Sequence, residues 1–93
     1  MVNNEGIASV KAAFNQLSGG VKVSVYDTVG VIVEGHKGVL FFDENSVIFR
    51  RKRGTISLNG ERMKIDEITD GDAYVSGDIH SVTYEVKLRE VND

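Results

Sequence analysis

The sequence predicts an all-β, mainly antiparallel sandwich or roll of about eight strands, preceded by one N-terminal helix. From Val21 onward, apolar and polar residues alternate with a period of two, and Gly, Asn and Asp interrupt this pattern every several residues. Only residues 4–18 place apolar side chains at helical spacing. A chain of 93 residues can bury one core. We therefore expect a helix within residues 1–20 that packs on the domain, and a single β domain at residues 21–93.

The helix is predicted because its apolar residues fall on one narrow face and helix-forming alanines lie between them in the sequence. Gly19 and Gly20 end it, because glycine accepts the left-handed conformation found at helix C-termini. The polar face carries only one nearby cation, Lys11, which disfavours a membrane-surface helix. We therefore expect this face to pack against a sheet or a partner through four residues: Ile7, Val10, Phe14 and Leu17.

The β region divides into segments separated by turn residues. The dipeptide Asn59-Gly60 is the strongest hairpin signal in the chain, since both residues tolerate positive φ. In the last segment Ile79 is out of register with the apolar series that starts at Val82, which predicts a bulge or break at His80-Ser81. The expected strands are 21–25, 29–33, 39–42, 47–52, 55–58, 62–68, 72–76 and 82–89.

Two segments are apolar on both faces, Val39–Phe42 and the region around Ile32. This pattern is typical of central strands that are covered on two sides. One short helix is too small to cover both of them. We therefore expect self-association, in the form of a homodimer.

The composition limits the chemistry and the compartment. The chain has no Cys, so disulfides, thiolate metal sites and a cysteine nucleophile are excluded. Its longest apolar run is four residues, far below the ~18 needed to cross a bilayer. The first residues lack the basic and apolar regions of a secretory signal. We expect a cytoplasmic protein.

A run of four cations follows Phe49: Arg50, Arg51, Lys52 and Arg53. In a strand, Arg50 and Lys52 would lie on one face, and Arg51 and Arg53 on the other face with Phe49. Such a cluster could bind nucleic acid, phosphate, an acidic partner or an anionic membrane surface. The net charge of −3 and the lack of further basic clusters disfavour nucleic acid. The other interpretation is a solvated hairpin end that discourages edge-to-edge aggregation.

No catalytic or metal-binding group is expected. The acidic segment Asp66 to Asp72 fails as a calcium loop, because Ile68 occupies a ligand position and Gly77 stands where the bidentate Glu belongs. His36 and His80 lack metal-ligand spacing beyond the weak Asp78-x-His80 pair. Asp78, His80 and Ser81 are neighbours in one strand and cannot converge on one reacting atom. We expect a protein that is not an enzyme and needs no cofactor.

Four segments, in continuous order from Gly30 to Glu85, resemble the YabP/YqfC family of sporulation proteins. The stretch Glu34-Gly35-His36-Lys37-Gly38 resembles the YqfC branch most closely. Gly35 departs from that branch, which favours Asn there. The segments that carry the resemblance are 31–42, 54–60, 63–68 and 75–84.

The resemblance implies a role in endospore formation, within the mother cell of a sporulating bacterium. It brings no catalytic residues with it. We therefore expect a non-catalytic structural or protein-interaction module that presents a sheet edge or face to a protein partner. The alternative is an anion-binding module that uses the basic residues at 50–53. Binding through phosphate contacts would weaken steeply with ionic strength, whereas an apolar interface would not.

Overall fold

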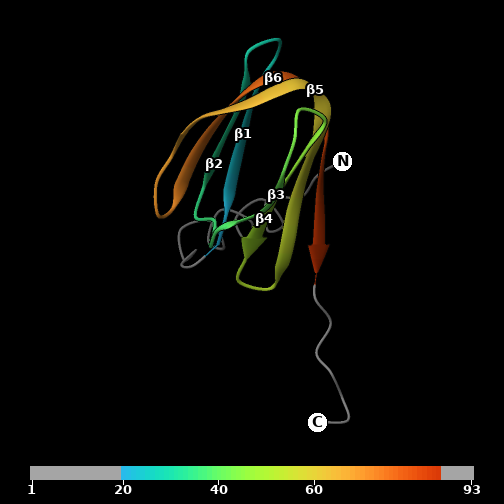
Figure 1. Ribbon diagram of the computed structural model, residues 1–93. Helices are drawn as coiled ribbons and strands as arrows, with labels where there is room; N and C mark the ends of the chain where they lie inside the picture. Colours follow the sequence, from blue (N-terminus) through green and yellow to red (C-terminus); the bar gives the residue numbers. More distant parts are fainter. Residues whose placement is uncertain (1–19, 87–93) are drawn as a thin grey trace, which may run out of the picture.

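The computed structural model describes residues 20–86, and these form one antiparallel sheet of six strands (Figure 1). The order across the sheet is β1-β2-β6-β5-β4-β3, so that β1 and β3 are its edges. The predicted all-β class is confirmed, and the helix predicted at 4–18 lies outside the described residues. The strands are β1 (Lys22–Tyr26), β2 (Gly30–Glu34), β3 (Val39–Phe42), β4 (Ser46–Arg51), β5 (Gly54–Ile68) and β6 (Asp72–Val86).

The long strands β5 and β6 bend over and divide the sheet into two layers (Figure 1). The first layer contains β1, β2 and the halves of β5 and β6 next to the turn that joins them. The second layer contains β3, β4 and the other halves of β5 and β6. Since β5 and β6 run through both layers, the two layers are parts of one continuous sheet.

The core lies between the layers and is built from alternate residues of the strands. In β2 and β4 the buried side chains are two positions apart, as expected for strands with one face toward the core. Val33, Val47, Phe49, Ile56 and Leu58 are fully buried. The complete core is Val31, Val33, Val47, Phe49, Ile56, Leu58, Met63, Ala73 and Val75.

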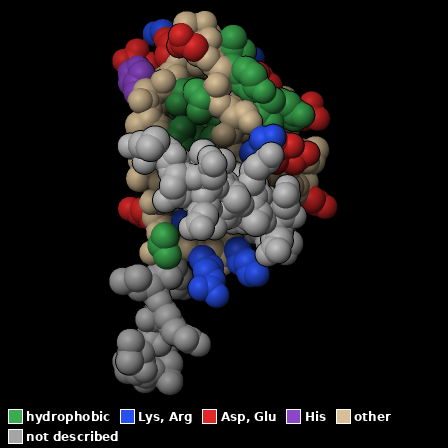
Figure 2. Space-filling model, turned by 180° about the vertical axis from the view of Figure 1, so that it is seen from behind, with side chains coloured by type: hydrophobic (Ala, Val, Ile, Leu, Met, Phe, Trp, Pro, Cys, Tyr) green, Lys and Arg blue, Asp and Glu red, His purple; other side chains and the backbone are tan. Residues whose placement is uncertain are grey.

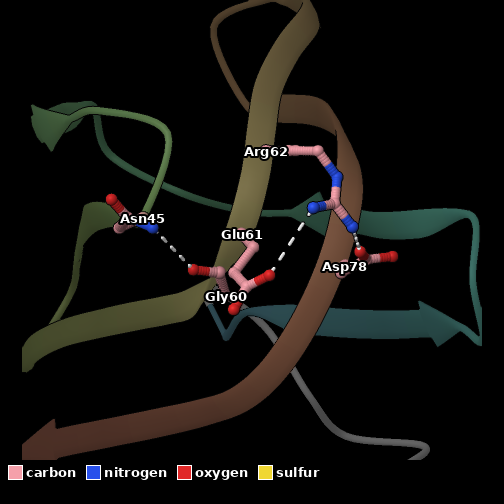
Figure 3. A network of polar contacts seen from close by, with 5 residues as sticks. All are labelled: Asn45, Gly60, Glu61, Arg62 and Asp78. Carbon is pink, nitrogen blue, oxygen red and sulfur yellow. Dashed lines mark hydrogen bonds and ion pairs between the residues drawn. The ribbon is translucent and has the colours of Figure 1, made fainter.

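Close backbone approach and a left-handed residue shape the bend. A Cβ on Gly60 would lie 2.0 Å from the carbonyl oxygen of Asp78, so only glycine allows β5 and β6 to approach this closely. Arg62 has a φ of 54°, and its side chain pairs with Asp78 across the strands (Figure 3). The side-chain amide of Asn45 donates to the carbonyl of Gly60 at 3.2 Å, which ties the β3–β4 turn to the same point.

Within residues 20–86 the structure has six strands, whereas about eight were predicted. The segments predicted at 55–58 and 62–68 belong to the single strand β5, and Asn59-Gly60 lies inside that strand rather than in a hairpin turn. The segment predicted at 72–76 and the start of the segment at 82–89 likewise join in β6. Gly60 is explained by the approach of Asp78, a contact from a distant segment that the local dipeptide signal does not contain.

Two further predictions have opposite outcomes. The predicted bulge is confirmed, because Asn59 pairs with Ser81 and Gly60 pairs with Ile79, which leaves His80 as the extra residue. The central position of Val39–Phe42 is wrong, since β3 is an edge strand whose last three residues are each 47% exposed. Apolar residues on both faces of a short strand therefore mark an exposed edge here.

Candidate interaction surfaces

The four cations at 50–53 lie at the end of the β4–β5 hairpin. Arg50 and Arg51 end β4, and Lys52 and Arg53 form the turn. Arg51 lies on the same strand face as Phe49, as predicted, and Arg50 lies on the opposite face. Figure 2 shows basic side chains projecting at this lower end of the molecule.

Arg51 is held by its neighbours. Its Nε donates to the carbonyl of Thr55 at 3.3 Å, and its Nη2 donates to the carbonyl of Glu85 at 3.2 Å. The guanidinium carbon lies 5.6 Å from the centre of the Tyr84 ring, within the range of a cation–π contact. Arg51 therefore joins β4 to β5 and β6 through two of the five N–H donors of its guanidinium.

A hollow of about 470 Å³ adjoins the basic hairpin end. Arg50, Arg51 and Lys52 line it, but so do the acidic Glu85 and the apolar Leu40 and Val86. The Glu85 carboxylate reduces the positive potential that would attract an anion. The lining of this hollow is therefore mixed, with cationic, acidic and apolar side chains.

His36 is a core residue rather than a surface ligand. Its side chain is 3% exposed, and its ring centre lies 5.1 Å from that of Phe49. Nδ1 accepts a hydrogen bond from the N–H of Gly38 at 3.0 Å, while Nε2 has no hydrogen-bond partner among the described residues. The burial of His36 was not predicted from the sequence, although its position between two apolar strands was the available signal.

The remaining candidate ligands are dispersed over the described part of the chain. His80 is exposed at the bulge of β6, and Asp70 and Gly71 form the β5–β6 turn. Within residues 20–86, no three His, Asp or Glu side chains gather in a way that could hold a metal ion. The same residues include no helical segment of the length and hydrophobicity required for a bilayer crossing.

The outer face of the first layer carries exposed apolar side chains. We call Tyr26, Val29, Ile32 and Tyr74 the outer tyrosine patch. Ile32 and Tyr74 are paired across β2 and β6, and all four residues line a shallow hollow of about 140 Å³. Tyr26 is 50% exposed, Val29 66% and Tyr74 41%. Figure 2 shows hydrophobic side chains gathered on the upper part of the face that it draws.

A second apolar surface lies at the open edge of the second layer. We call Leu40, Phe41 and Phe42 the β3 edge. Phe41 pairs with Ile48 and shares the outer face with it, whereas Phe42 pairs with Val47 and shares the core face. Both kinds of surface that the sequence analysis proposed for a partner, a sheet face and a sheet edge, therefore carry exposed apolar side chains.

Comparison with known proteins identifies the family of the chain. Comparisons with curated proteins and with solved structures find no match. Comparison with protein families matches residues 18–90 to the YabP family. This range contains all six strands and the whole segment that resembles YabP/YqfC proteins, but it does not confirm the YqfC branch. The chain belongs to the YabP family.

Proposed function

We propose that this chain is a non-catalytic protein-interaction module in endospore formation, and that a partner protein binds its outer tyrosine patch. Membership of the YabP family supports the sporulation setting, because the resemblance described above is to sporulation proteins. The cellular site that we propose is the cytoplasm of the mother cell. The observation that carries the proposal is the outer tyrosine patch, in which the exposed Tyr26, Val29 and Tyr74 line one hollow together with the half-buried Ile32.

The chemistry of this patch suits a protein partner. Tyrosine is enriched at protein interfaces, because its ring buries apolar area while its hydroxyl keeps a polar contact. Tyr26 on β1 and Tyr74 on β6 line the hollow together with Ile32 on β2, so a partner side chain inserted there would contact all three residues. The strands beneath the patch are held in register by β2, which pairs with both β1 and β6. A rigid platform of this kind lowers the entropy lost on binding.

The test replaces both tyrosines at the gene's own locus in the source bacterium. A gene deletion is expected to lower the yield of heat-resistant spores without changing vegetative growth. The double variant Tyr26→Ser/Tyr74→Ser should reproduce the deletion while its protein level stays normal, because the apolar contact is lost. The matched control is Tyr84→Ser, which removes a 51% exposed tyrosine from the other layer and should sporulate normally.

Each part of the proposal has its own contradicting result. A deletion that leaves the spore yield unchanged would remove the sporulation role. Normal spores from the double tyrosine variant, with a clear defect in the deletion strain, would remove the patch as the binding surface. Equal defects in the double variant and in Tyr84→Ser would also count against the patch.

The anion-binding alternative is separated by a charge-reversal variant. Because Arg51 holds β4 to β5 and β6, the variant reverses only the other three cations, as Arg50→Glu, Lys52→Glu and Arg53→Glu. The interaction module predicts that this variant recovers the same protein partner as the wild type at low and high salt. Nucleic acid or anionic lipid recovered by the wild type alone, and lost at high salt, would favour the alternative instead.

A further inference from the structure

We propose that β3 is a self-association edge, and that two copies of this chain pair through antiparallel β3 strands to form a two-fold dimer with one continuous sheet. Among the strands of residues 20–86, β3 pairs only with β4. Its side chains Leu40, Phe41 and Phe42 are each 47% exposed. This proposal does not depend on the proposed function, because the outer tyrosine patch lies on the other layer.

The backbone of β3 has groups available for pairing at its open side. The N–H of Asp43 donates to the carbonyl of Ser46 at 2.8 Å, and the N–H of Ser46 donates to the carbonyl of Asp43 at 3.4 Å. In two antiparallel strands, the residue next to such a doubly hydrogen-bonded residue pair directs its N–H and C=O away from the partner strand. Phe42 therefore presents its N–H and C=O at the sheet edge, where a second strand can pair with them.

The β3 edge lacks the charges that usually protect edge strands. Proteins avoid edge-to-edge pairing by placing Lys, Pro or inward-pointing charges on exposed edges. The sequence Val39–Phe42 contains none of these, although the strand has a register shift between Val39 and Phe41. The opposite edge, β1, begins with the exposed Lys22. A second copy that pairs with β3 would cover the exposed apolar side chains of Leu40, Phe41 and Phe42.

The charges at the two ends of β3 determine the orientation of the second copy. Lys37 precedes the strand, and Asp43 and Glu44 follow it; all three residues are exposed. An antiparallel copy places Lys37 of one chain beside the acidic end of the other, twice in the dimer. A parallel copy would place like charges together. Charge complementarity therefore selects the two-fold antiparallel arrangement, which is also the arrangement that closes with two copies.

The first test measures the dimer dissociation constant by sedimentation velocity for the wild type and two lysine variants. Phe41→Lys places one lysine from each copy within the edge-to-edge contact. The repulsion between these two charges should raise the dissociation constant about tenfold or more. The matched control is Val25→Lys, at a 55% exposed position on the other edge strand, which should leave the dimer intact. Circular dichroism and thermal unfolding check that both variants fold.

A charge exchange tests the orientation with substitutions confined to exposed side chains. Lys37→Glu and Glu44→Lys should each weaken the dimer, since each places like charges opposite one another. The double variant should restore it. The backbone bonds of these residues, from Lys37 N–H to the Arg50 carbonyl and from Met63 N–H to the Glu44 carbonyl, do not involve the exchanged groups. The singles are therefore expected to fold even if Phe41→Lys does not.

Three results would overturn the proposal. The wild type could remain monomeric up to high micromolar concentration. Val25→Lys could break the dimer while Phe41→Lys leaves it intact, which would assign the contact to β1. The double variant could fail to recover affinity, which would exclude the antiparallel pairing. None of these results bears on the spore phenotype of the tyrosine variants, so failure here is distinguishable from failure of the proposed function.

Discussion

At the residue scale, His36 serves as a core side chain that also closes a backbone turn. Its ring packs on Phe49, and its Nδ1 accepts from the N–H two residues later. An acceptor at Nδ1 places the ring proton of the neutral form on Nε2. The connection between β2 and β3 crosses from one layer to the other at this point, so one side chain supports both the core and the crossing.

The first prediction concerns this residue. His36→Ala should lower the free energy of unfolding by about 2–4 kcal/mol, because it removes a buried ring and leaves the N–H of Gly38 without its acceptor. Urea denaturation followed by circular dichroism measures the change. His80→Ala is the control, since His80 is exposed at a bulge, and it should change stability by less than about 0.5 kcal/mol. Equal effects of the two substitutions would contradict the core role.

At the scale of single elements, the continuity of β5 depends on the glycine at its bend. Asn59-Gly60 has the local signature of a hairpin, but the chain continues through it as one bent strand and does not reverse direction. The carbonyl of Asp78 and the side chain of Asn45 both lie against Gly60. These contacts come from residues that are 18 and 15 positions away in the sequence, so a local pattern cannot contain them.

The second prediction compares two glycines of the long hairpin. Gly60→Ala should destabilise the protein by about 1–3 kcal/mol, because the added methyl group would lie against a backbone carbonyl that cannot rotate away. Gly71→Ala is the matched control, since nothing lies within 4 Å of the position of its Cβ. Thermal or urea unfolding of the two variants gives the comparison. A Gly60→Ala protein as stable as Gly71→Ala would show that the two strands can separate at the bend without cost.

At the scale of the whole molecule, two strands provide the covalent and hydrogen-bonded link between the layers. β5 and β6 pair along their length, through three register shifts, and each contributes residues to both layers. Val33 in the first layer and Val47 in the second lie in the same core. Opening one layer would expose the core face of the other, which is unfavourable.

The third prediction follows from this shared core. The two layers should unfold in one cooperative transition, so that amides of Val33 and Val47 report the same midpoint in urea by hydrogen exchange or two-dimensional NMR. Leu58→Ala should move both midpoints down together by the equivalent of about 2–5 kcal/mol. Two separate transitions, or a shift of only the Val47 midpoint, would contradict a single cooperative unit.

The sequence by itself determined the all-β class, the bulge at His80 and the family, because side-chain alternation and the order of turn residues are local properties of the chain. Only the tertiary structure decided which strands lie at the edges and that Asn59-Gly60 stays within a strand. It also decided that His36 is buried and that Arg51 donates a hydrogen bond to the carbonyl of Glu85 in β6. Each of these depends on a contact with a distant segment. The alternation of apolar and polar residues specifies which face of a strand a side chain lies on. Pairing with distant strands decides which residues that side chain contacts.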